Sequence, residues 1–348
     1  MRTVEIRAIA RVISPLAVIL CLFGVTACSA PAASAPTSVP AKQAAPAPAT
    51  TEKYPTRPID FIVPWGAGGG ADQMARKLSP LAEKELGVPL PVINVAGAAG
   101  STGTVKMLAA PADGYAFEAY MADQVATVAF GQAPFTHKDF APIARIMQQF
   151  SSFFVRTDGP YKSWKDVETA AKANPGKIRV AITGAGSVDE LLVLFFEKKG
   201  VKMTGVPFPQ PGERYTSLLG GHADVLIEQC GDITQYLTGG QFKPVIMFSE
   251  ERAAAFPDCP SSKELGYDIY LPQWRSIVAK AGTDPTRIKM IGDALNKACS
   301  TQVWKDYLKE TYSDEKSWMG PDAFPAYLTK HENEVLAVIE QSGLNTKK

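Results

Sequence analysis

The sequence predicts an α/β fold built from doubly wound parallel sheets. Short strands rich in β-branched residues alternate with segments of helical spacing over most of the 348 residues, starting at Ile59. Three strand-to-helix junctions are glycine-rich loops, at 66–72, 97–103 and 184–187. Repetition of strand, loop and helix is typical of βαβ units, in which neighbouring strands run parallel and helices cover the sheet.

The first elements of the chain show this pattern clearly. Residues 59–63 form a short β-branched run ended by Pro64, and we expect a strand there. A helix is expected over 72–86, where apolar residues recur at helical spacing until Gly87. The same part of the chain is expected to contain strands at 90–95 and 115–121, and a helix from the loop at 97–103 through Ala110.

Similar signals continue to the C-terminus. Strands are expected at 178–183, 201–208, 223–229, 244–249 and 276–279. Helices are expected at 162–173, 188–199, 215–220, 233–239, 286–300, 302–310 and 321–342. Three of these helices follow one another at the C-terminus and close the chain.

The N-terminus has the organisation of an export signal. Three arginines and one acid lie in residues 1–11, and an apolar run follows over 12–27. A basic segment before an apolar run shorter than the roughly 20 residues of a membrane span is typical of a secretory signal. The run ends at Cys28 after Val-Thr-Ala, which resembles the lipobox of bacterial lipoproteins. We interpret residues 1–27 as a lipoprotein signal peptide, the alternative being an ordinary signal peptide with a chance cysteine.

The segment that follows supports a membrane anchor. Residues 28–53 consist almost wholly of Ala, Pro, Ser and Thr and contain no aromatic residue. Such a segment cannot bury enough apolar surface to offset the entropy lost on ordering, so it is expected to be a flexible linker. We therefore expect a body outside the cytoplasm, held at a membrane by lipid on Cys28.

Composition narrows the classes of partner. Five basic and two acidic residues precede Tyr54, which leaves 31 basic and 33 acidic residues in the body and a net charge of −2. Nucleic acid is not an expected partner, because its recognition requires a basic face. With only three scattered histidines, neither a metal site nor a cofactor is predicted.

Of Cys230, Cys259 and Cys299, the first two are the favoured disulfide pair, with the third left as a free thiol.

The three glycine loops are the candidate ligand site. Each leaves the carboxyl end of a strand and enters a helix, the edge at which open α/β sheets bind ligands. Glycine permits close approach of the backbone, and a helix N-terminus offers free N–H groups to a carboxylate or phosphate. Each loop alone could be a structural turn, and Asp72 could serve as a helix N-cap. The candidate residues in the loops are Gly68, Gly69, Gly70, Asp72, Gly100, Ser101, Thr102, Thr183, Gly184, Gly186 and Ser187.

Motifs of nucleotide binding and catalysis are weak or missing. No loop matches G-x-x-x-x-G-K-[ST], and the looser dinucleotide fingerprint at 66–71 lacks the acidic residue expected after the next strand. There is no G-x-S-x-G nucleophile elbow. We therefore predict a binding protein without catalytic residues. A secreted hydrolase that uses Ser101 or Ser187 with His137 or His222 is the alternative.

A set of motifs resembles the extracytoplasmic solute receptors of tripartite tricarboxylate transporters, often called the Bug family. Each motif is short, but their shared order and spacing from Tyr54 to about Ser342 is specific. The motifs begin with Tyr54-Pro55-Thr56-Arg57-Pro58-Ile59, Val63-Pro64-Trp65 leading to Gly68-Gly69 and Asp72, Gly97-Ala98-Ala99-Gly100-Ser101-Thr102-Gly103 and Pro111-Ala112-Asp113-Gly114-Tyr115. They continue with Asp139-Phe140-Ala141-Pro142-Ile143, Asn174-Pro175-Gly176-Lys177, Gly184-Ala185-Gly186-Ser187, Gly220-Gly221-His222-Ala223-Asp224 and Trp274.

The resemblance implies two doubly wound α/β domains around a ligand cleft, a periplasmic-binding-protein-like fold of type II. Residues 54–155 plus 275–348 would form domain 1 and residues 156–274 domain 2, with the hinge near Val155 and Trp274. The ligand implied is a small organic carboxylate, held by loop backbone and water instead of arginine. The partner implied is a set of membrane permease subunits, served by a monomeric receptor. Delivery to an ABC importer or a sensor kinase is the alternative.

Several positions depart from the family pattern. Trp65 stands where phenylalanine is common, and Gly66 and Gly70 replace common prolines. Glu190 stands where histidine is common, and residues 209–212 replace a tyrosine-lysine-glycine turn. The remaining candidates, expected near the cleft mouth together with Trp65 and Gln229, are Asp123 and Glu228. If Glu228 faces the cleft uncompensated, it would repel a second carboxylate on the ligand.

Overall fold

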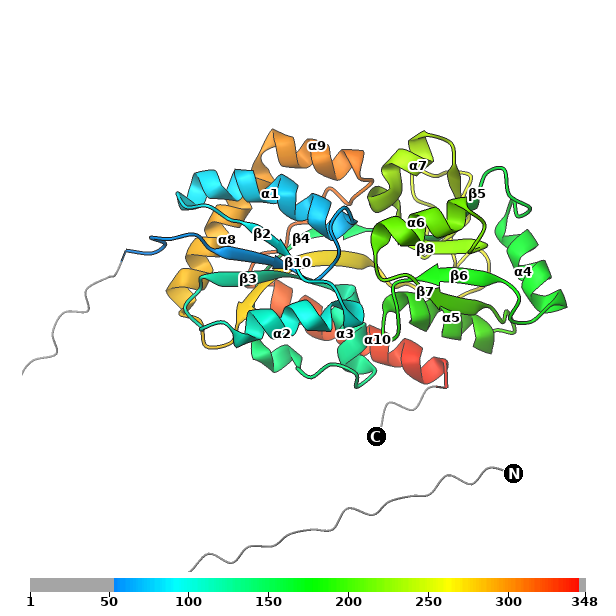
Figure 1. Cartoon of the computed structure of the whole chain (residues 1–348), viewed down its shortest axis with the longest axis horizontal. Coiled ribbons are helices and arrows are strands. Elements are labelled where there is room, and N and C mark those ends of the chain that lie inside the picture. Colours follow the sequence, from blue (N-terminus) through cyan, green and yellow to red (C-terminus); the bar gives the residue numbers. More distant parts are fainter. Residues whose placement is uncertain (1–52, 344–348) are drawn as a thin grey trace, which may run out of the picture. The chain divides into compact units, whose positions relative to one another are not determined.

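A computed structural model describes residues 53–343, which form two lobes, each built on a five-stranded sheet (Figure 1). The strand order is β2-β1-β3-β10-β4 in the first lobe and β7-β6-β8-β5-β9 in the second. The interpreted signal peptide, Cys28 and all but the last residue of the linker lie outside the described residues. Within residues 53–343, no helix combines the length and the apolar character that crossing a membrane requires.

The first lobe contains the expected βαβ units. Strands β1 (Asp60–Val63), β2 (Val92–Asn94) and β3 (Ala116–Met121) run parallel. Strand β10 (Gln273–Lys280) lies between β3 and β4 (Phe140–Gln149) and is antiparallel to both. The helices of this part of the chain are α1 (Gly70–Leu86), α2 (Ser101–Ala109), α3 (Ala122–Ala129), α8 (Pro285–Ser300), α9 (Gln302–Glu310) and α10 (Phe324–Gln341).

The second lobe repeats the arrangement. Strands β6 (Arg179–Ile182), β7 (Thr204–Pro207) and β8 (Val225–Gln229) run parallel. Strand β5 (Ser151–Arg156) is antiparallel to β8 and to β9 (Phe242–Met247). The helices are α4 (Trp164–Ala173), α5 (Val188–Lys198), α6 (Pro211–Leu219) and α7 (Thr234–Thr238). Helix α5 covers one face of this sheet and α6 covers the other (Figure 1).

Both sheets are mixed: the expected βαβ units supply the parallel strands, and antiparallel strands are added to each sheet. The antiparallel strands β4, β5 and β10 connect the lobes, and such crossings do not need the helix of a βαβ unit. The chain passes from the first sheet to the second at Phe150, so Val155 lies inside β5 and not at the expected domain boundary. The return crossing ends where β10 begins at Gln273, next to the expected Trp274.

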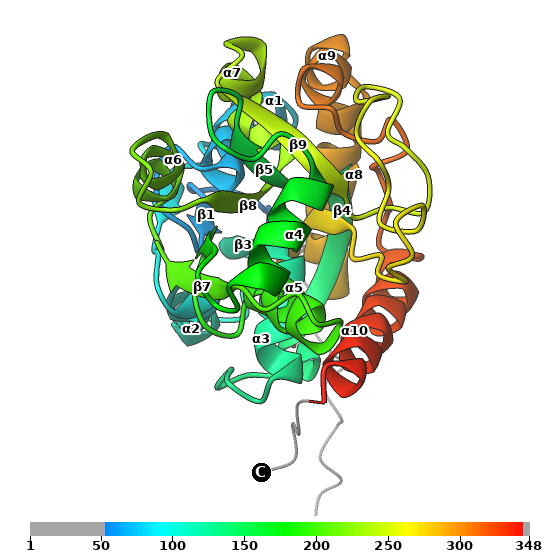
Figure 2. The same ribbon diagram turned by 90° about the vertical axis from the view of Figure 1, so that its right-hand side faces the viewer.

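Contacts between the lobes extend along both edges of the body. Figures 1 and 2 place α7 and α9 at one edge and α10 at the opposite edge. Helix α10 packs against α3 and β4 of the first lobe and against α5 of the second. Its Phe324 packs edge-to-face on the buried Trp274. At the other edge, a short 3₁₀ turn over Cys230–Ile233 of the second lobe contacts α1 of the first.

The expected Cys230–Cys259 disulfide is wrong for this structure. Both residues lie buried in the core of the second lobe, as the domain argument required, but both are free thiols. Cys230 Sγ instead lies 4.0 Å from Met247 Sδ. A shared core is predictable from the sequence, whereas the distance between two thiols, on which a disulfide depends, is not. Cys299 is also free and buried.

Candidate ligand-binding cleft

Two chambers lie where β–α loops of the two lobes face each other. We call the larger one, of about 290 Å³, the loop chamber, because its walls include Ala96 to Ala99 of the first lobe and Thr183 to Ala185 of the second. The smaller one, of about 40 Å³, is the charged chamber. Its ionisable wall residues are Asp123, Asp189, Arg214, Glu228, Asp232 and Arg275. Trp65, Thr183 and Pro209 line both chambers, so the two are adjacent.

Six of the twelve residues that line the loop chamber are glycine or alanine. Ala98 and Ala99 have φ values of 46° and 47°, a left-handed conformation that costs energy for a residue with a side chain. Gly97 and Gly184 have φ values of 139° and 153°, which glycine adopts readily. Within residues 53–343, the N–H groups of Ala98, Ala99, Gly184 and Ala185 have no backbone acceptor. Residues of the described chain with unsatisfied backbone N–H groups therefore come from both lobes.

The first ion pair of the charged chamber lies within the second lobe. Helix α6 begins with Pro211 and directs Arg214 toward β8, where Arg214 Nη2 donates to Glu228 Oε2 at 2.7 Å. Arg214 Nη1 also donates to the carbonyl oxygen of Phe208 at 3.0 Å. The Arg214 and Glu228 side chains are 8% and 4% exposed. Glu228 is therefore compensated, which corrects the hypothesis of an uncompensated carboxylate in the cleft.

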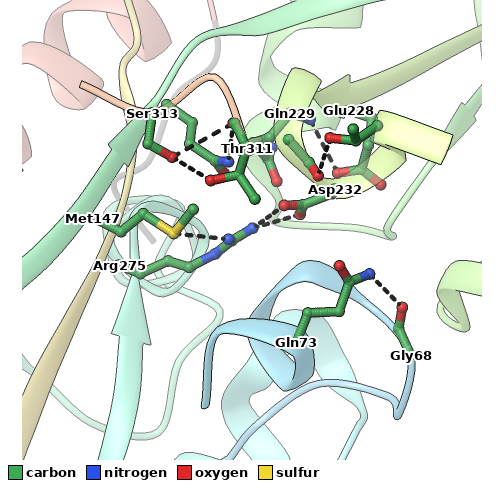
Figure 3. Close-up of polar contacts among 12 residues, drawn as sticks. Gly68, Gln73, Met147, Glu228, Gln229, Asp232, Arg275, Thr311 and Ser313 are labelled. Atoms are coloured by element: carbon green, nitrogen blue, oxygen red, sulfur yellow. Dashed lines mark hydrogen bonds and ion pairs between the residues drawn. The ribbon is translucent and has the colours of Figure 1, made fainter. Parts of the chain in front are cut away.

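The second ion pair joins the two lobes (Figure 3). Arg275 on β10 donates to Asp232 on the Cys230–Ile233 turn, with 2.6 Å from Nη2 to Oδ1 and a second contact to Oδ2. Both side chains are buried, and Arg275 Nη1 also lies 3.3 Å from Met147 Sδ. The Gln229 side-chain amide is oriented with its nitrogen toward the two acids. That nitrogen lies 3.1 Å from Asp232 Oδ2 and 3.0 Å from Glu228 Oε1 and donates to both. Gln229 thus links the two ion pairs into one network.

Two further carboxylates complete the charged chamber. Asp123 on α3 of the first lobe accepts the N–H of Val188 in the second lobe at 3.0 Å. Asp189 on α5 accepts the N–H and the hydroxyl of Thr183, each at 2.8 Å. Burial, reinforced by the negative charge of Asp189, raises the pKa of Asp123 to about 7. Burial raises the pKa of Asp189 to about 6, against the opposing effect of Arg214.

The structure brings half of the predicted site residues into the chamber walls. Those that line a chamber are Trp65, Gly69, Gly70, Asp123, Thr183, Gly184 and Glu228. Those that lie outside both walls are Gly68, Asp72, Gly100, Ser101, Thr102, Gly186 and Ser187. Each of the three predicted loops contributes at least one residue to these walls, but the sequence did not resolve which residues of each loop line a chamber.

Residues outside the walls have supporting roles within their loops. Asp72 Oδ2 accepts the N–H of Gly68 at 2.9 Å, and Ser187 caps α5 by accepting the N–H of Glu190 at 3.2 Å. The Glu190 carboxylate accepts the N–H of Gly186 at 2.7 Å. Several loop N–H groups expected to meet a ligand are thus satisfied by the protein's own carboxylates.

Four charged wall residues were not predicted from the sequence: Asp189, Arg214, Asp232 and Arg275. One usable signal was Arg275, a charged residue between Trp274 and the run Ser-Ile-Val-Ala of β10. A buried arginine requires a partner, so its position indicates an acid on a facing element. The identity of that acid depends on the tertiary structure.

The hydrolase alternative finds no support in the hydrogen bonding. The Ser187 hydroxyl donates to the carbonyl of Gly184 at 2.7 Å, and the Ser101 hydroxyl has no hydrogen-bond partner within residues 53–343. His137 Nδ1 lies 3.1 Å from the Tyr120 hydroxyl, and neither His137 nor His222 lines a chamber. Neither serine is therefore paired with a histidine in the described part of the chain.

A family model, the tripartite tricarboxylate transporter family receptor (TctC), matches residues 74–343, more than half of the chain. The chain belongs to this family. The resemblance inferred from the motifs is thereby confirmed, and with it the role of a solute receptor. This TctC receptor is 30% identical over 311 residues to the UPF0065 protein in the gbd 5′ region of Cupriavidus necator, a match that covers 86% of this chain and 92% of the relative.

Solved structures agree with the fold of this TctC receptor. A TctC solute-binding protein from Polaromonas, solved without ligand, is 30% identical with a TM-score of 0.61, and the match covers 83% of this chain and all of that one. MatC from Rhodopseudomonas palustris, solved with bound malate, is 23% identical with a TM-score of 0.76 over 82% of this chain and all of that one. The periplasmic-binding-protein-like fold with two α/β domains is confirmed.

Proposed function

We propose that this TctC receptor binds a small organic carboxylate in the loop chamber and delivers it to a permease of the tripartite tricarboxylate type. The observation that carries the proposal is a set of unsatisfied backbone N–H groups in the described residues that line the chamber. N–H groups of Ala98, Ala99, Gly184 and Ala185 come from both lobes and have no backbone acceptor within residues 53–343. A carboxylate between them would satisfy donors on both sides and stabilise the closed arrangement of the lobes.

The dimensions of the chamber suit a small acid. Its volume of about 290 Å³ lies just below the roughly 300–1,000 Å³ that is usual for small-molecule sites. Trp65 offers an aromatic surface to the body of the ligand, and its indole nitrogen has no hydrogen-bond partner within residues 53–343. Malate in MatC is a precedent for a small carboxylate in a protein of this fold.

The place of action follows from the N-terminus. We propose that Cys28 carries the lipid and that residues 28–53 tether a monomeric body outside the cytoplasm, within reach of the permease. If Cys28 is lipidated, mass spectrometry of the protein purified from membranes should show a diacylglyceryl group on Cys28. An unmodified mature N-terminus would contradict the anchor without affecting the proposal about the cleft.

Binding is tested with a matched pair of glycine substitutions. Gly184 and Gly266 both have positive φ values, and a Cβ on either meets no atom within 4 Å, but only Gly184 lines the chamber. Both substitutions therefore place a methyl group in open space at a backbone conformation that favours glycine, and thermal unfolding of each variant measures the strain separately from binding. We expect Gly184→Ala to weaken binding in calorimetric titrations against a panel of organic acids, and Gly266→Ala to bind like the unsubstituted protein. Equal affinities of the two variants would remove the loop at 183–185 from the site.

A further inference from the structure

We propose that the charged chamber excludes a second carboxylate, so that this receptor selects acids with one carboxylate and an uncharged or cationic remainder. The inference rests on the proposed binding of a carboxylate in the loop chamber. The chambers share Trp65, Thr183 and Pro209, so the far end of a ligand held in the loop chamber is directed toward the charged chamber. The charges in that chamber then determine which chemical groups can bind at the second end of the ligand.

Both guanidinium groups of the charged chamber are already occupied by the protein's own carboxylates. Arg214 is bound by Glu228 at 2.7 Å, and Arg275 is bound by both oxygens of Asp232. These are the only cationic side chains in the chamber wall among residues 53–343. A ligand carboxylate could reach a guanidinium only by displacing a buried, hydrogen-bonded acid, which would leave that acid without a partner.

Asp232 occupies the position that suits a bound anion best. Its carboxylate fills the space where a Cβ on Gly70 would lie, at the N-terminus of the 17-residue helix α1, and Arg275 faces it from β10. A helix N-terminus together with an arginine is a favourable anion site. The second lobe thus places its own carboxylate into an anion site of the first lobe, where the far carboxylate of a diacid would otherwise bind.

The remaining charges also oppose a second carboxylate. Asp123 and Asp189 also line the wall, and neither forms an ion pair with a cationic side chain among residues 53–343, although Arg214 lowers the pKa of Asp189 against the opposing effect of burial. Any ionisation of these two acids makes the chamber negative. A like charge next to them is repelled, whereas an ammonium group or an uncharged chain is not.

A ligand panel with matched carbon skeletons tests the inference on the full-length protein. For each skeleton, linear or aromatic, the monocarboxylate, the dicarboxylate and the amino-substituted monocarboxylate are compared by calorimetric titration. We expect the dicarboxylate to bind about 100-fold or more weakly than the other two acids of its skeleton. A dicarboxylate that binds as tightly as its monocarboxylate would overturn the inference and leave the proposed function intact. If no acid of any class binds, the proposed function fails and the inference fails with it.

A substitution isolates the role of Asp232. Asp232→Asn removes the competing charge while keeping the shape, so the dicarboxylate should gain about tenfold or more in affinity relative to its monocarboxylate. The matched control is Asp158→Asn, which removes an acid from the exposed pair with Arg156 and should leave selectivity unchanged. The double variant Asp232→Asn/Arg275→Gln should lose the gain, because the freed guanidinium is gone. If a folded Asp232→Asn variant shows no gain in relative affinity for the dicarboxylate, the role of Asp232 is contradicted. If the variant does not fold, the ligand panel on the unsubstituted protein decides the inference.

Discussion

Gly70 of the first lobe and Asp232 of the second lobe are fitted to each other: the Asp232 carboxylate occupies the space where a Cβ on Gly70 would lie. Gly70 begins α1, and Asp232 lies on the turn at Cys230–Ile233 and binds Arg275. The two lobes therefore approach each other at a position where only glycine leaves room for the buried ion pair.

This fit predicts a cost for a single methyl group. Gly70→Ala should destabilise the protein by about 1–3 kcal/mol, because the added carbon overlaps a buried carboxylate that cannot move without breaking its ion pair. Gly212→Ala is the control, since Gly212 also lies in the first turn of a helix and a Cβ there meets no atom within 4 Å. Urea denaturation of both variants tests this prediction, and equal stabilities would show that the lobes do not interlock at Gly70.

Ligand affinity should depend on pH through Asp123 and Asp189. Burial raises the pKa of Asp123 to about 7 and that of Asp189 to about 6, so both acids are largely protonated at low pH and acquire charge as the pH rises. A carboxylate ligand should therefore bind about tenfold more tightly near pH 5 than near pH 8. Calorimetric titration across this interval tests the prediction, and Asp123→Asn should flatten the profile. An affinity that increases with pH would contradict it.

Stability should also depend on pH through Glu118 on β3. Burial raises the pKa of this carboxyl from 4.5 to about 8, although Thr104 and Gln124 donate hydrogen bonds to it. A pKa raised in the folded state means that the stabilisation is complete below about pH 4.5 and is lost as the pH rises toward about 8. Glu118→Gln keeps both hydrogen bonds and removes the titration.

The variant should therefore be more stable than the unsubstituted protein near pH 8, by roughly 2–4 kcal/mol, and the difference should shrink toward acidic pH. Thermal unfolding at a series of pH values measures this difference. An exposed counterpart, Glu315→Gln, should show no comparable trend. A Glu118→Gln difference that stays constant with pH would show that Glu118 does not titrate as described.

The thiols should be unreactive in the folded protein. Burial raises the pKa of the Cys230 and Cys299 thiols far above the ordinary value and that of Cys259 to about 12, so little thiolate forms at neutral pH. Ellman's reagent should not label these three thiols in the folded protein. After denaturation it should label all three, with no need for prior reduction. A requirement for a reducing agent would indicate that Cys230 and Cys259 pair in the protein after all.

Local signals in the sequence identified most of the elements but not those that join the lobes. Helix α9 lies at its expected bounds, and α1, α5 and α8 lie within two residues of theirs. The segment from Phe140 to Arg156 was not recognised as two strands, because buried polar residues interrupt the apolar pattern of both and two register shifts against β10 disturb the alternation along β4. Helix α3, with eight residues, is too short for a clear helical period.

By itself the sequence determined the alternation of strands and helices and the family, and it identified the three glycine loops as the candidate site. These features depend on residues close together in the chain, whose spacing and conformational preferences can be recognised directly. Only the tertiary structure decided which charges meet in the cleft. Asp123, Asp189, Arg214, Asp232 and Arg275 come from five different elements. Whether an acid among them repels a ligand or neutralises an arginine depends on distances of a few ångströms between those elements, because the energy of two buried charges depends on their separation and on the water excluded around them.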